Sequence, residues 1–293
     1  MFALIDNPAS GRRDHEALLA RLKEHIAGQG DEARVFETRK AGDGERQTRL
    51  ALEAGCDRVA VIGGDGSLSD AVRALAGSGA TLCLVPTGTG NDFARALGLP
   101  KDPMEAFAAQ LRGEEAQIDC GAVNGRPFLN VAGTGFDVDV LRRTEELKAE
   151  YPGPQAYRRA ILSVLRHYEA AQMDVSVDGG AFERCRATIV EIANGRYIGG
   201  GMKVAPGAKV DDGLFDVVRV GAVPRRAIPL LLPLFIAGAH VRLPVARVCR
   251  ARRVTIRREG MTVNIDGDLA RMDEARFEIL PGALRVMRPA AKA

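Results

Sequence analysis

Two aspartates follow glycine-rich turns in the first third of the chain, where loops could hold phosphate groups. Asp65 lies in the segment GGDGS (residues 63–67), and Asp92 ends the segment PTGTGND (residues 86–92). Glycine adopts positive φ without strain, so consecutive backbone N–H groups in such loops can turn toward one anion. A carboxylate beside an anion is repelled unless a cation lies between them. We therefore expect a phosphorylated ligand and Mg²⁺ at these loops.

Each loop follows a short apolar run, residues 59–62 (VAVI) and 82–85 (LCLV). Runs without alternation are typical of parallel strands that are covered on both faces. One helical segment, residues 68–76, separates them, and ligands of open α/β sheets gather at the carboxyl ends of the strands. Glycines alone could simply make tight turns, but the second loop favours a binding site. No Walker A lysine occurs, so backbone N–H groups, a metal and Arg95 are the expected phosphate partners.

The loops resemble the signatures of a known family. GGDGS resembles the GGDGT loop that diacylglycerol kinases, sphingosine kinases, NAD kinases and phosphofructokinases share. Residues 86–95 (PTGTGNDFAR) resemble the second signature of the diacylglycerol kinase catalytic domain specifically. The resemblance continues through residues 7–11 (NPASG), 200–216 and 266–268 (DGD), so it covers nearly the whole chain. It implies a bacterial soluble lipid kinase of the diacylglycerol and sphingosine kinase type.

The order of expected elements predicts two domains. Four strand–helix repeats up to about residue 117 indicate a doubly wound, mainly parallel α/β sheet, as in NAD kinases and diacylglycerol kinases. Successive hairpins, with turns at residues 124–125 and 178–180, then indicate an antiparallel β-sandwich. We place the boundary at Asp119–Cys120, which gives a nucleotide-binding domain (1–119) and a sandwich domain for lipid and metal (120–276). The resemblance implies that residues 277–293 return to the first domain.

The resemblance also implies which residues contact ATP. They belong to the first loop, the end of the second strand and the two glycine loops. They are Asn7, Ser10, Gly11, Thr38, Gly64, Asp65, Gly66, Ser67, Leu68, Ser69, Asp70 and Thr89. Ser67 stands where the family usually has threonine and keeps the hydroxyl, and Asp70 stands where glutamate is frequent.

Phosphoryl transfer also needs a group that accepts the proton of the attacking hydroxyl. Read without the resemblance, residues 266–268 (DGD) indicate a hairpin turn. The resemblance assigns Asp266 as the general base, and Asp268 stands where the family usually has glutamate.

A second acid pair, in residues 209–214 (KVDDGL), also indicates a turn when read alone. The resemblance implies a structural Mg²⁺ here, held by the carboxylate of Asp212 and by the main-chain carbonyls of Lys209 and Leu214. Water would link this ion to the acids Asp65, Asp92 and Asp119.

The whole-chain properties exclude several other classes. A net charge of +3 is too small to predict a nucleic-acid partner. The five scattered cysteines predict neither disulfides nor zinc, and the first residues lack a secretory signal, so we expect a cytoplasmic protein. Residues 228–239 (IPLLLPLFIAGA) are too short to span a bilayer. They indicate a buried helix, a lid over an apolar cleft or, with the arginines that follow, a peripheral contact with the membrane. The oligomeric state is not readable.

We interpret the chain as an ATP- and Mg²⁺-dependent lipid kinase that phosphorylates the hydroxyl of a lipid alcohol such as diacylglycerol. Two alternatives remain, an NAD kinase-like small-molecule kinase and a non-catalytic module that binds lipid or nucleotide. Residues 91–95 (NDFAR) favour the lipid kinase over the NAD kinase. Which lipid accepts the phosphate is left open.

Overall fold

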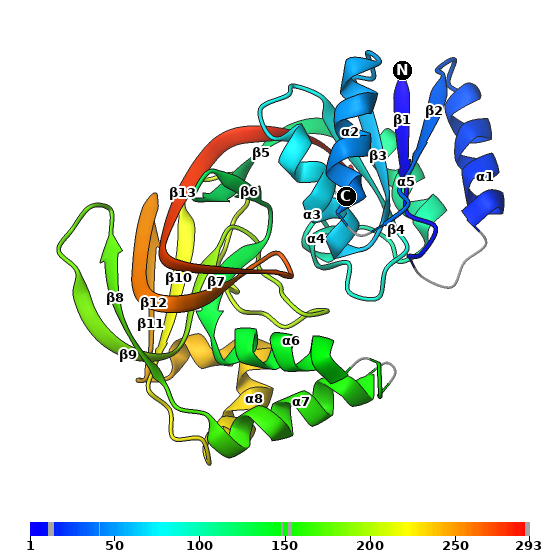
Figure 1. Ribbon diagram of the computed structural model, residues 1–293. Helices are drawn as coiled ribbons and strands as arrows, with labels where there is room; N and C mark the ends of the chain where they lie inside the picture. Colours follow the sequence, from blue (N-terminus) through cyan, green and yellow to red (C-terminus); the bar gives the residue numbers. More distant parts are fainter. Residues whose placement is uncertain (11–14, 41, 148, 152–153, 291–293) are drawn as a thin grey trace.

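The structure, a computed structural model, describes residues 1–10, 15–40, 42–147, 149–151 and 154–290. Its first part is a parallel sheet with strand order β4-β3-β1-β2 (Figure 1). The strands are β1 (Phe2–Asp6), β2 (Ala33–Glu37), β3 (Arg58–Gly63) and β4 (Thr81–Pro86). Their carboxyl ends lie at one edge of the sheet, where the glycine loops begin.

Helices cover both faces of this sheet. The helices α1 (His15–Ala27) and α5 (Pro103–Leu111) pack on the face that carries Phe2 and Leu4. The helices α2 (Asp43–Glu53) and α3 (Asp65–Leu75) pack on the face that carries Ala3 and Ile5. Because both faces are buried, β1, β3 and β4 are nearly continuous apolar runs, whereas the edge strand β2 is partly exposed. The predicted doubly wound α/β fold is confirmed, and a short helix, α4 (Asp92–Ala96), follows the second glycine loop.

The second part is antiparallel and sandwich-like, as predicted. Its strands are β5 (Glu114–Val123), β6 (Arg126–Phe128), β7 (Val131–Gly135), β8 (Ala171–Val177), β9 (Glu183–Ala193), β10 (Phe215–Gly221), β11 (Ala246–Ala251), β12 (Arg253–Ile265) and β13 (Asp268–Arg288). Phe128 and Phe215 stack in its core with ring centroids 5.8 Å apart.

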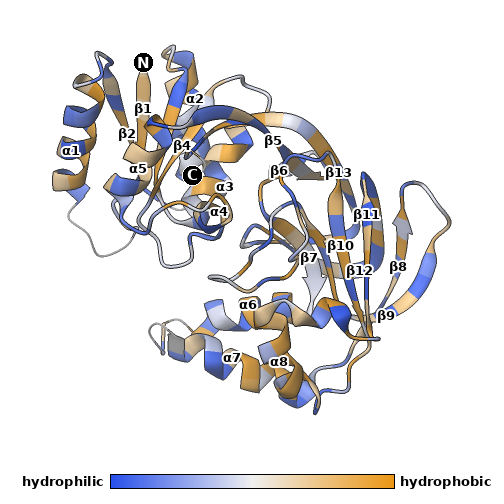
Figure 2. Ribbon diagram, turned by 180° about the vertical axis from the view of Figure 1, so that it is seen from behind, coloured by the Kyte–Doolittle hydropathy of each residue, from blue (hydrophilic) through white to orange (hydrophobic). Residues whose placement is uncertain are grey.

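Three helices form a separate layer against this sheet, at the bottom of Figure 1. They are α6 (Phe136–Leu147), α7 (Pro154–His167) and α8 (Ile228–Ala237), followed by the short 3₁₀ helix η1 (Ala239–Arg242). Figure 2 shows α8 as largely hydrophobic. No helix among the described residues is long and apolar enough to cross a membrane.

The long strand β13 joins the two parts (Figure 1). It pairs antiparallel with β12 and β5, and its last residues pair parallel with β4, with Arg285 beside Thr81 and Val286 beside Leu82. We propose the division into 1–119 with 277–293 and 120–276, which the pairing with β4 supports. The boundaries fall inside the continuous strands β5 and β13, and residues 291–293 lie outside the described residues.

Candidate active site

The two glycine loops touch each other. Strands β3 and β4 pair in parallel with Gly63 beside Pro86, so both loops start at the same edge. The N–H of Thr87 donates to the carbonyl oxygen of Gly63 at 3.0 Å. A Cβ added to Gly88 would lie only 2.5 Å from the Cα of Gly64. The loops can approach this closely only because both residues at the contact are glycine.

A polar pocket with an empty volume of about 580 Å³ lies beside the first loop. It is lined by Ile5, Asn7, Thr38, Lys40, Gly42, Gly44, Gly66, Ser67, Asp70 and Asp268. The Asn7 Nδ2 donates to Ser67 Oγ at 2.8 Å, which ties the loop after β1 to the start of α3. The N–H groups in the first turn of a helix favour an anion. The pocket therefore brings together several of the residues predicted to bind ATP.

Other predicted ATP residues lie outside this pocket. Gly64 and Asp65 line a smaller neighbouring one. The side chains of Leu68 and Ser69 are buried in the first domain, so only their backbone could face a ligand. Thr89 is exposed.

The loop after β1 is placed only in part. The Ser10 hydroxyl accepts a hydrogen bond from Thr87 Oγ1 at 3.1 Å, which brings this loop against the second glycine loop. Gly11 lies outside the described residues.

Lys40 is a pocket residue that the sequence reasoning missed. It follows β2, is exposed, and lines the polar pocket with Thr38. An ammonium group there complements phosphate charge. The only available signal was a lysine shortly after a strand that ends at the same edge of the sheet.

Asp65, which is half-buried, and Asp92, which is buried, connect the glycine loops to the second part of the chain. Asp65 Oδ1 accepts the N–H of Asp92 at 2.7 Å, and Asp92 Oδ2 accepts the N–H of Gly200 at 2.9 Å. Arg95 donates to the other oxygen of Asp92 at 2.8 Å. Burial raises the pKa of both carboxyls, and the charge of Asp92 adds to the rise at Asp65. These contacts fix the glycine turn at residues 199–201 on the first domain.

Asp266 occupies the turn between β12 and β13 with a positive φ of 50°. Its carboxylate accepts the backbone N–H groups of Leu129, Asn130 and Val131 at 2.5, 2.9 and 3.0 Å. Burial raises the pKa of Asp266 to about 6, these hydrogen bonds oppose the rise, and the charge of Asp65 adds to it. A fixed carboxyl group with a pKa close to neutrality suits a proton acceptor.

Asp268, which lines the polar pocket, forms ion pairs with two arginines. Its Oδ2 contacts the guanidinium groups of Arg73, on α3, and Arg126, on β6. Arg73 also pairs with Asp70 at 3.0 Å. The aspartate that stands in place of the family's glutamate therefore connects the two parts of the chain beside the predicted ATP residues.

The predicted magnesium site at residues 209–214 already has a cationic neighbour. Asp212 Oδ1 accepts the N–H of Leu214 at 3.2 Å, and its other oxygen contacts the guanidinium of Arg250. Asp119 accepts the N–H groups of Gly213 and Gly282 at 2.7 and 2.9 Å. Asp212 Oδ2 is buried without a hydrogen-bond partner, which suits a cation ligand, but the guanidinium of Arg250 lies against the same oxygen and would compete with a divalent ion for it. The assignment to Lys209, Asp212 and Leu214 stays a prediction.

The described part of the chain contains no group of three or more His, Cys, Asp or Glu side chains placed to hold a metal. The charge of Asp65 raises the pKa of Asp266, and a divalent ion beside the two carboxylates would offset their repulsion. Carboxylate oxygens are the ligands that Mg²⁺ prefers, together with phosphate oxygens of a substrate.

Known proteins resemble this chain over almost its whole length. Residues 1–123 match the model of the diacylglycerol kinase catalytic domain, and residues 130–288 match that of the YegS C-terminal NAD kinase beta sandwich-like domain. A "Diacylglycerol kinase" of Mycobacterium tuberculosis is 33% identical over 97% of this chain and 94% of the relative. A "Probable lipid kinase YegS-like" protein of Pseudomonas aeruginosa is 37% identical over 98% and 93%.

Solved structures share the fold. A diacylglycerol kinase of Bacillus anthracis superposes with a TM-score of 0.75 at 23% identity, covering 98% of this chain and 96% of the other. An NAD kinase of Archaeoglobus fulgidus in complex with ATP superposes with a TM-score of 0.56 at 14% identity, covering 99% and 94%. At these identities the structures show the fold alone. The relatives from Mycobacterium tuberculosis and Pseudomonas aeruginosa are 33% and 37% identical over nearly the whole chain, and the two domain models match consecutive parts of it. The chain therefore belongs to the family of diacylglycerol kinases and YegS-like lipid kinases.

Proposed function

We propose that the protein transfers the γ-phosphate of ATP to the hydroxyl of a lipid alcohol such as diacylglycerol, with Asp266 as the general base. The observation that carries the proposal is the position of Asp266. Its carboxylate is held by three backbone N–H groups of the second domain and lies close enough to Asp65 of the first glycine loop for their charges to interact. An acid at that junction can meet a nucleotide from one side and a lipid hydroxyl from the other.

In this mechanism the polar pocket binds ATP. The backbone N–H groups of residues 64–67, the hydroxyl of Ser67 and the ammonium of Lys40 hold its phosphates. Mg²⁺, when bound, neutralises the charge on the phosphate oxygens. The lipid hydroxyl attacks the γ-phosphorus, the bond from that phosphorus to the bridging oxygen of ADP breaks, and Asp266 takes the hydroxyl proton. The three N–H groups keep the carboxylate in place throughout.

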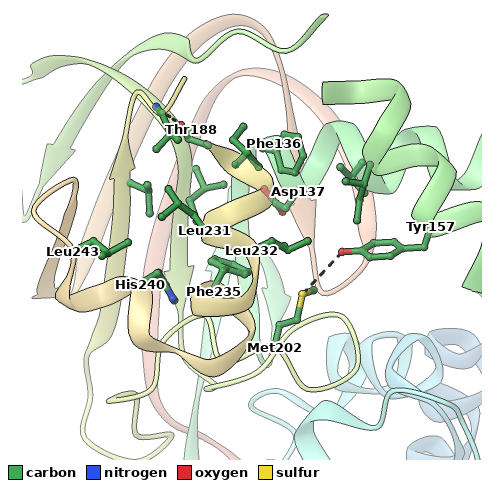
Figure 3. A pocket seen from close by; sticks show the side chains of 16 residues that line it. Phe136, Asp137, Tyr157, Thr188, Met202, Leu231, Leu232, Phe235, His240 and Leu243 are labelled. Atoms are coloured by element: carbon green, nitrogen blue, oxygen red, sulfur yellow. Dashed lines mark hydrogen bonds between the residues drawn. The ribbon is translucent and has the colours of Figure 1, made fainter. Parts of the chain in front are cut away.

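An apolar pocket suits the acyl chain. It lies among α6, α7, α8 and the sheet, and it has an empty volume of about 730 Å³. Figure 3 shows Phe136, Leu231, Leu232 and Phe235 around it. Burying a CH₂ group contributes about 0.8 kcal/mol, so several methylene groups here would supply most of the binding energy for a lipid. A purely polar substrate such as NAD would leave this pocket unused, which favours the lipid kinase over the NAD kinase.

Incubation with γ-labelled ATP, Mg²⁺ and mixed micelles of lipid alcohols is expected to yield a labelled phospholipid. Chelation of Mg²⁺ by EDTA should abolish the product, because the phosphate charge is then not neutralised. The measurement is thin-layer separation of the labelled products, with NAD as a parallel acceptor. Labelled NADP would favour the alternative kinase. Bound ATP without any labelled acceptor would indicate a non-catalytic module.

The substrate is expected to reach the pocket from a membrane surface. Large apolar side chains on α7 and α8 are exposed: Leu162 by 63%, Leu230 by 78% and Ile236 by 47%. The same layer carries the exposed arginines Arg158, Arg159, Arg225 and Arg226. On β12, by contrast, Arg257 is paired with Glu274. We therefore propose that α7 and α8 rest on anionic lipid at the inner face of the membrane.

Substituting Leu230→Glu should weaken binding to anionic vesicles by about tenfold, since it removes an inserted leucine and adds a charge that the surface repels. Co-sedimentation with vesicles of mixed phosphatidylcholine and phosphatidylserine measures the partition. Leu50→Glu is the matched control, because Leu50 is an exposed leucine on α2 in the other domain. Equal losses in both variants would contradict the assignment of this surface.

A further inference from the structure

An acid on the wall of the apolar pocket and a buried acid beside it have no part in the mechanism above. Asp137 lies in the first turn of α6 and lines the pocket (Figure 3). Glu191 lies on β9, is only 1% exposed, and is close enough to Asp137 for each carboxyl group to shift the pKa of the other. Two carboxyl groups this close avoid mutual repulsion when they share one proton in a hydrogen bond. We call Asp137 and Glu191 the acid pair.

The acid pair has almost no other polar partner. Both carboxylate oxygens of Asp137 and Oε1 of Glu191 are buried without a hydrogen-bond donor among the described residues. The strand neighbours of Glu191 are Gly133 on β7 and Val218 on β10, which bring no side-chain donor. Burial raises the pKa of both carboxyls; next to burial, Asp137 adds to the rise at Glu191, whereas Glu191 opposes the rise at Asp137. Buried polar groups are normally satisfied, so the unsatisfied oxygens of Asp137 at the pocket wall, with Glu191 beside it, point to a ligand.

The position of the acid pair relates it to the transfer site. The N–H of Val131, at the start of β7, holds the carboxylate of Asp266. Two residues further, Gly133 lies against Glu191, where an added Cβ would come 2.2 Å from Glu191 Oε2. A strand rises by about 3.3 Å per residue, so the two contacts are about 7 Å apart along β7. The next residue on that face of β9, Ile189, lines the apolar pocket. The acid pair thus lies between the proposed base and the acyl pocket.

We propose that the acid pair binds a second hydrogen-bond donor of the lipid, a hydroxyl or an amine beside the hydroxyl that is phosphorylated. The inference rests on the proposed function and names its substrate class. Two carboxyl groups that share one proton offer only acceptor lone pairs to a third group, so they select a donor. A monoacylglycerol supplies a second hydroxyl and a sphingoid base supplies an amine. A 1,2-diacylglycerol has esters that only accept, so the pair favours the first two lipids over the third.

The test compares kcat/KM for 1-oleoylglycerol, sphinganine and 1,2-dioleoylglycerol in wild type, Asp137→Asn and Glu191→Gln. We expect wild type to prefer the lipids with a second donor. Each variant should lower the ratio of kcat/KM for these lipids to that for dioleoylglycerol at least tenfold. If the variants lose kcat/KM only for 1-oleoylglycerol, the donor is a hydroxyl. If they lose it only for sphinganine, the donor is an amine. Asp139→Asn is the control, because Asp139 lies on the same helix but is paired with Arg142 at 3.2 Å. An unchanged ratio, or a wild-type preference for dioleoylglycerol, would overturn the inference.

A second readout separates a binding role from a structural one. If the acid pair supports the fold, substituting one of its members lowers the stability of the protein. If the pair is retained for a ligand, its unsatisfied buried oxygens destabilise the free protein, and substitution raises the stability. Glu191→Gln should therefore raise Tm by about 2 °C or more without lipid. It should also remove the rise in Tm that 1-oleoylglycerol gives to wild type. If wild type phosphorylates no lipid, the proposed function fails, and this binding arm decides the inference alone: equal shifts in wild type and variant would refute it.

Discussion

Replacing Asp266 by asparagine is expected to lower kcat for lipid phosphorylation by about 10²–10⁴-fold while ATP still binds. The amide cannot accept the proton of the lipid hydroxyl, but the polar pocket is lined by other residues. The variant also exchanges one of two acceptor oxygens for an NH₂ group, although Leu129 donates to one oxygen and Asn130 and Val131 to the other. One or two backbone N–H groups then lose their acceptor, at a cost of about 1–3 kcal/mol in stability.

Measuring ATP binding by calorimetry beside lipid phosphorylation separates these effects. Asp174→Asn is a suitable control, because Asp174 pairs with Arg184 on the sandwich domain and lines neither the polar nor the apolar pocket. The pH profile gives a further check. Asp266 must be ionised to accept a proton and its pKa is raised to about 6, so wild-type kcat should fall as the pH drops through about 6. A variant with wild-type kcat would exclude Asp266 as the base.

The first domain was predictable because its signals are local. The apolar runs of β3 and β4 end at glycine loops within the same short segment, and helix and strand alternate through β1 to β4. Residues 266–268 were read both as a hairpin turn and as the site of the proposed base, and the two interpretations are compatible. Asp266 and Gly267 have φ values of 50° and 100°, as a tight hairpin requires, and Ile265 pairs with Asp268. The same turn presents the Asp266 carboxylate to the N–H groups of residues 129–131.

Features that depend on distant contacts were not predictable from patterns in the chain. Arg73 meets Asp268 across 195 residues, and no local motif marks either as a partner of the other. Helix α6 was missed because acidic and basic residues interrupt its apolar positions, Phe136, Val140 and Leu147, which are buried only when α7 and α8 pack against them. Strands β12 and β13 each continue through irregularities in register, and in the sequence alone such a bulge cannot be told from the end of a strand because the partner strand is unknown.

The second large effect is expected from Gly88→Ala, which should weaken both the fold and ATP binding. An added Cβ would lie 2.5 Å from the Cα of Gly64 and 3.0 Å from Asn91 Oδ1, so backbone must move. Overpacking of this kind costs about 1–3 kcal/mol. The displaced residue, Gly64, directly precedes Asp65, the first residue of α3. A shift of about 1 Å in groups that position a substrate can cost about 10²-fold in rate, so we expect a lower Tm, weaker ATP binding and a strongly reduced kcat.

Gly66→Ala distinguishes contact between the loops from contact with the nucleotide. A Cβ at Gly66 meets no protein atom within 4 Å, because the residue faces the polar pocket. That variant should keep the wild-type Tm and lose ATP affinity, since the methyl group occupies space meant for phosphate. Gly207→Ala, whose Cβ would have its nearest neighbour at 3.7 Å, should change neither. If Gly88→Ala bound ATP as wild type does, the contact between the two loops would not matter for ATP binding. The proposal that both loops together position the phosphates would then be wrong. If Gly66→Ala bound ATP normally, the phosphates would lie elsewhere, although the close contact of Gly64 and Gly88 would remain a requirement of the fold.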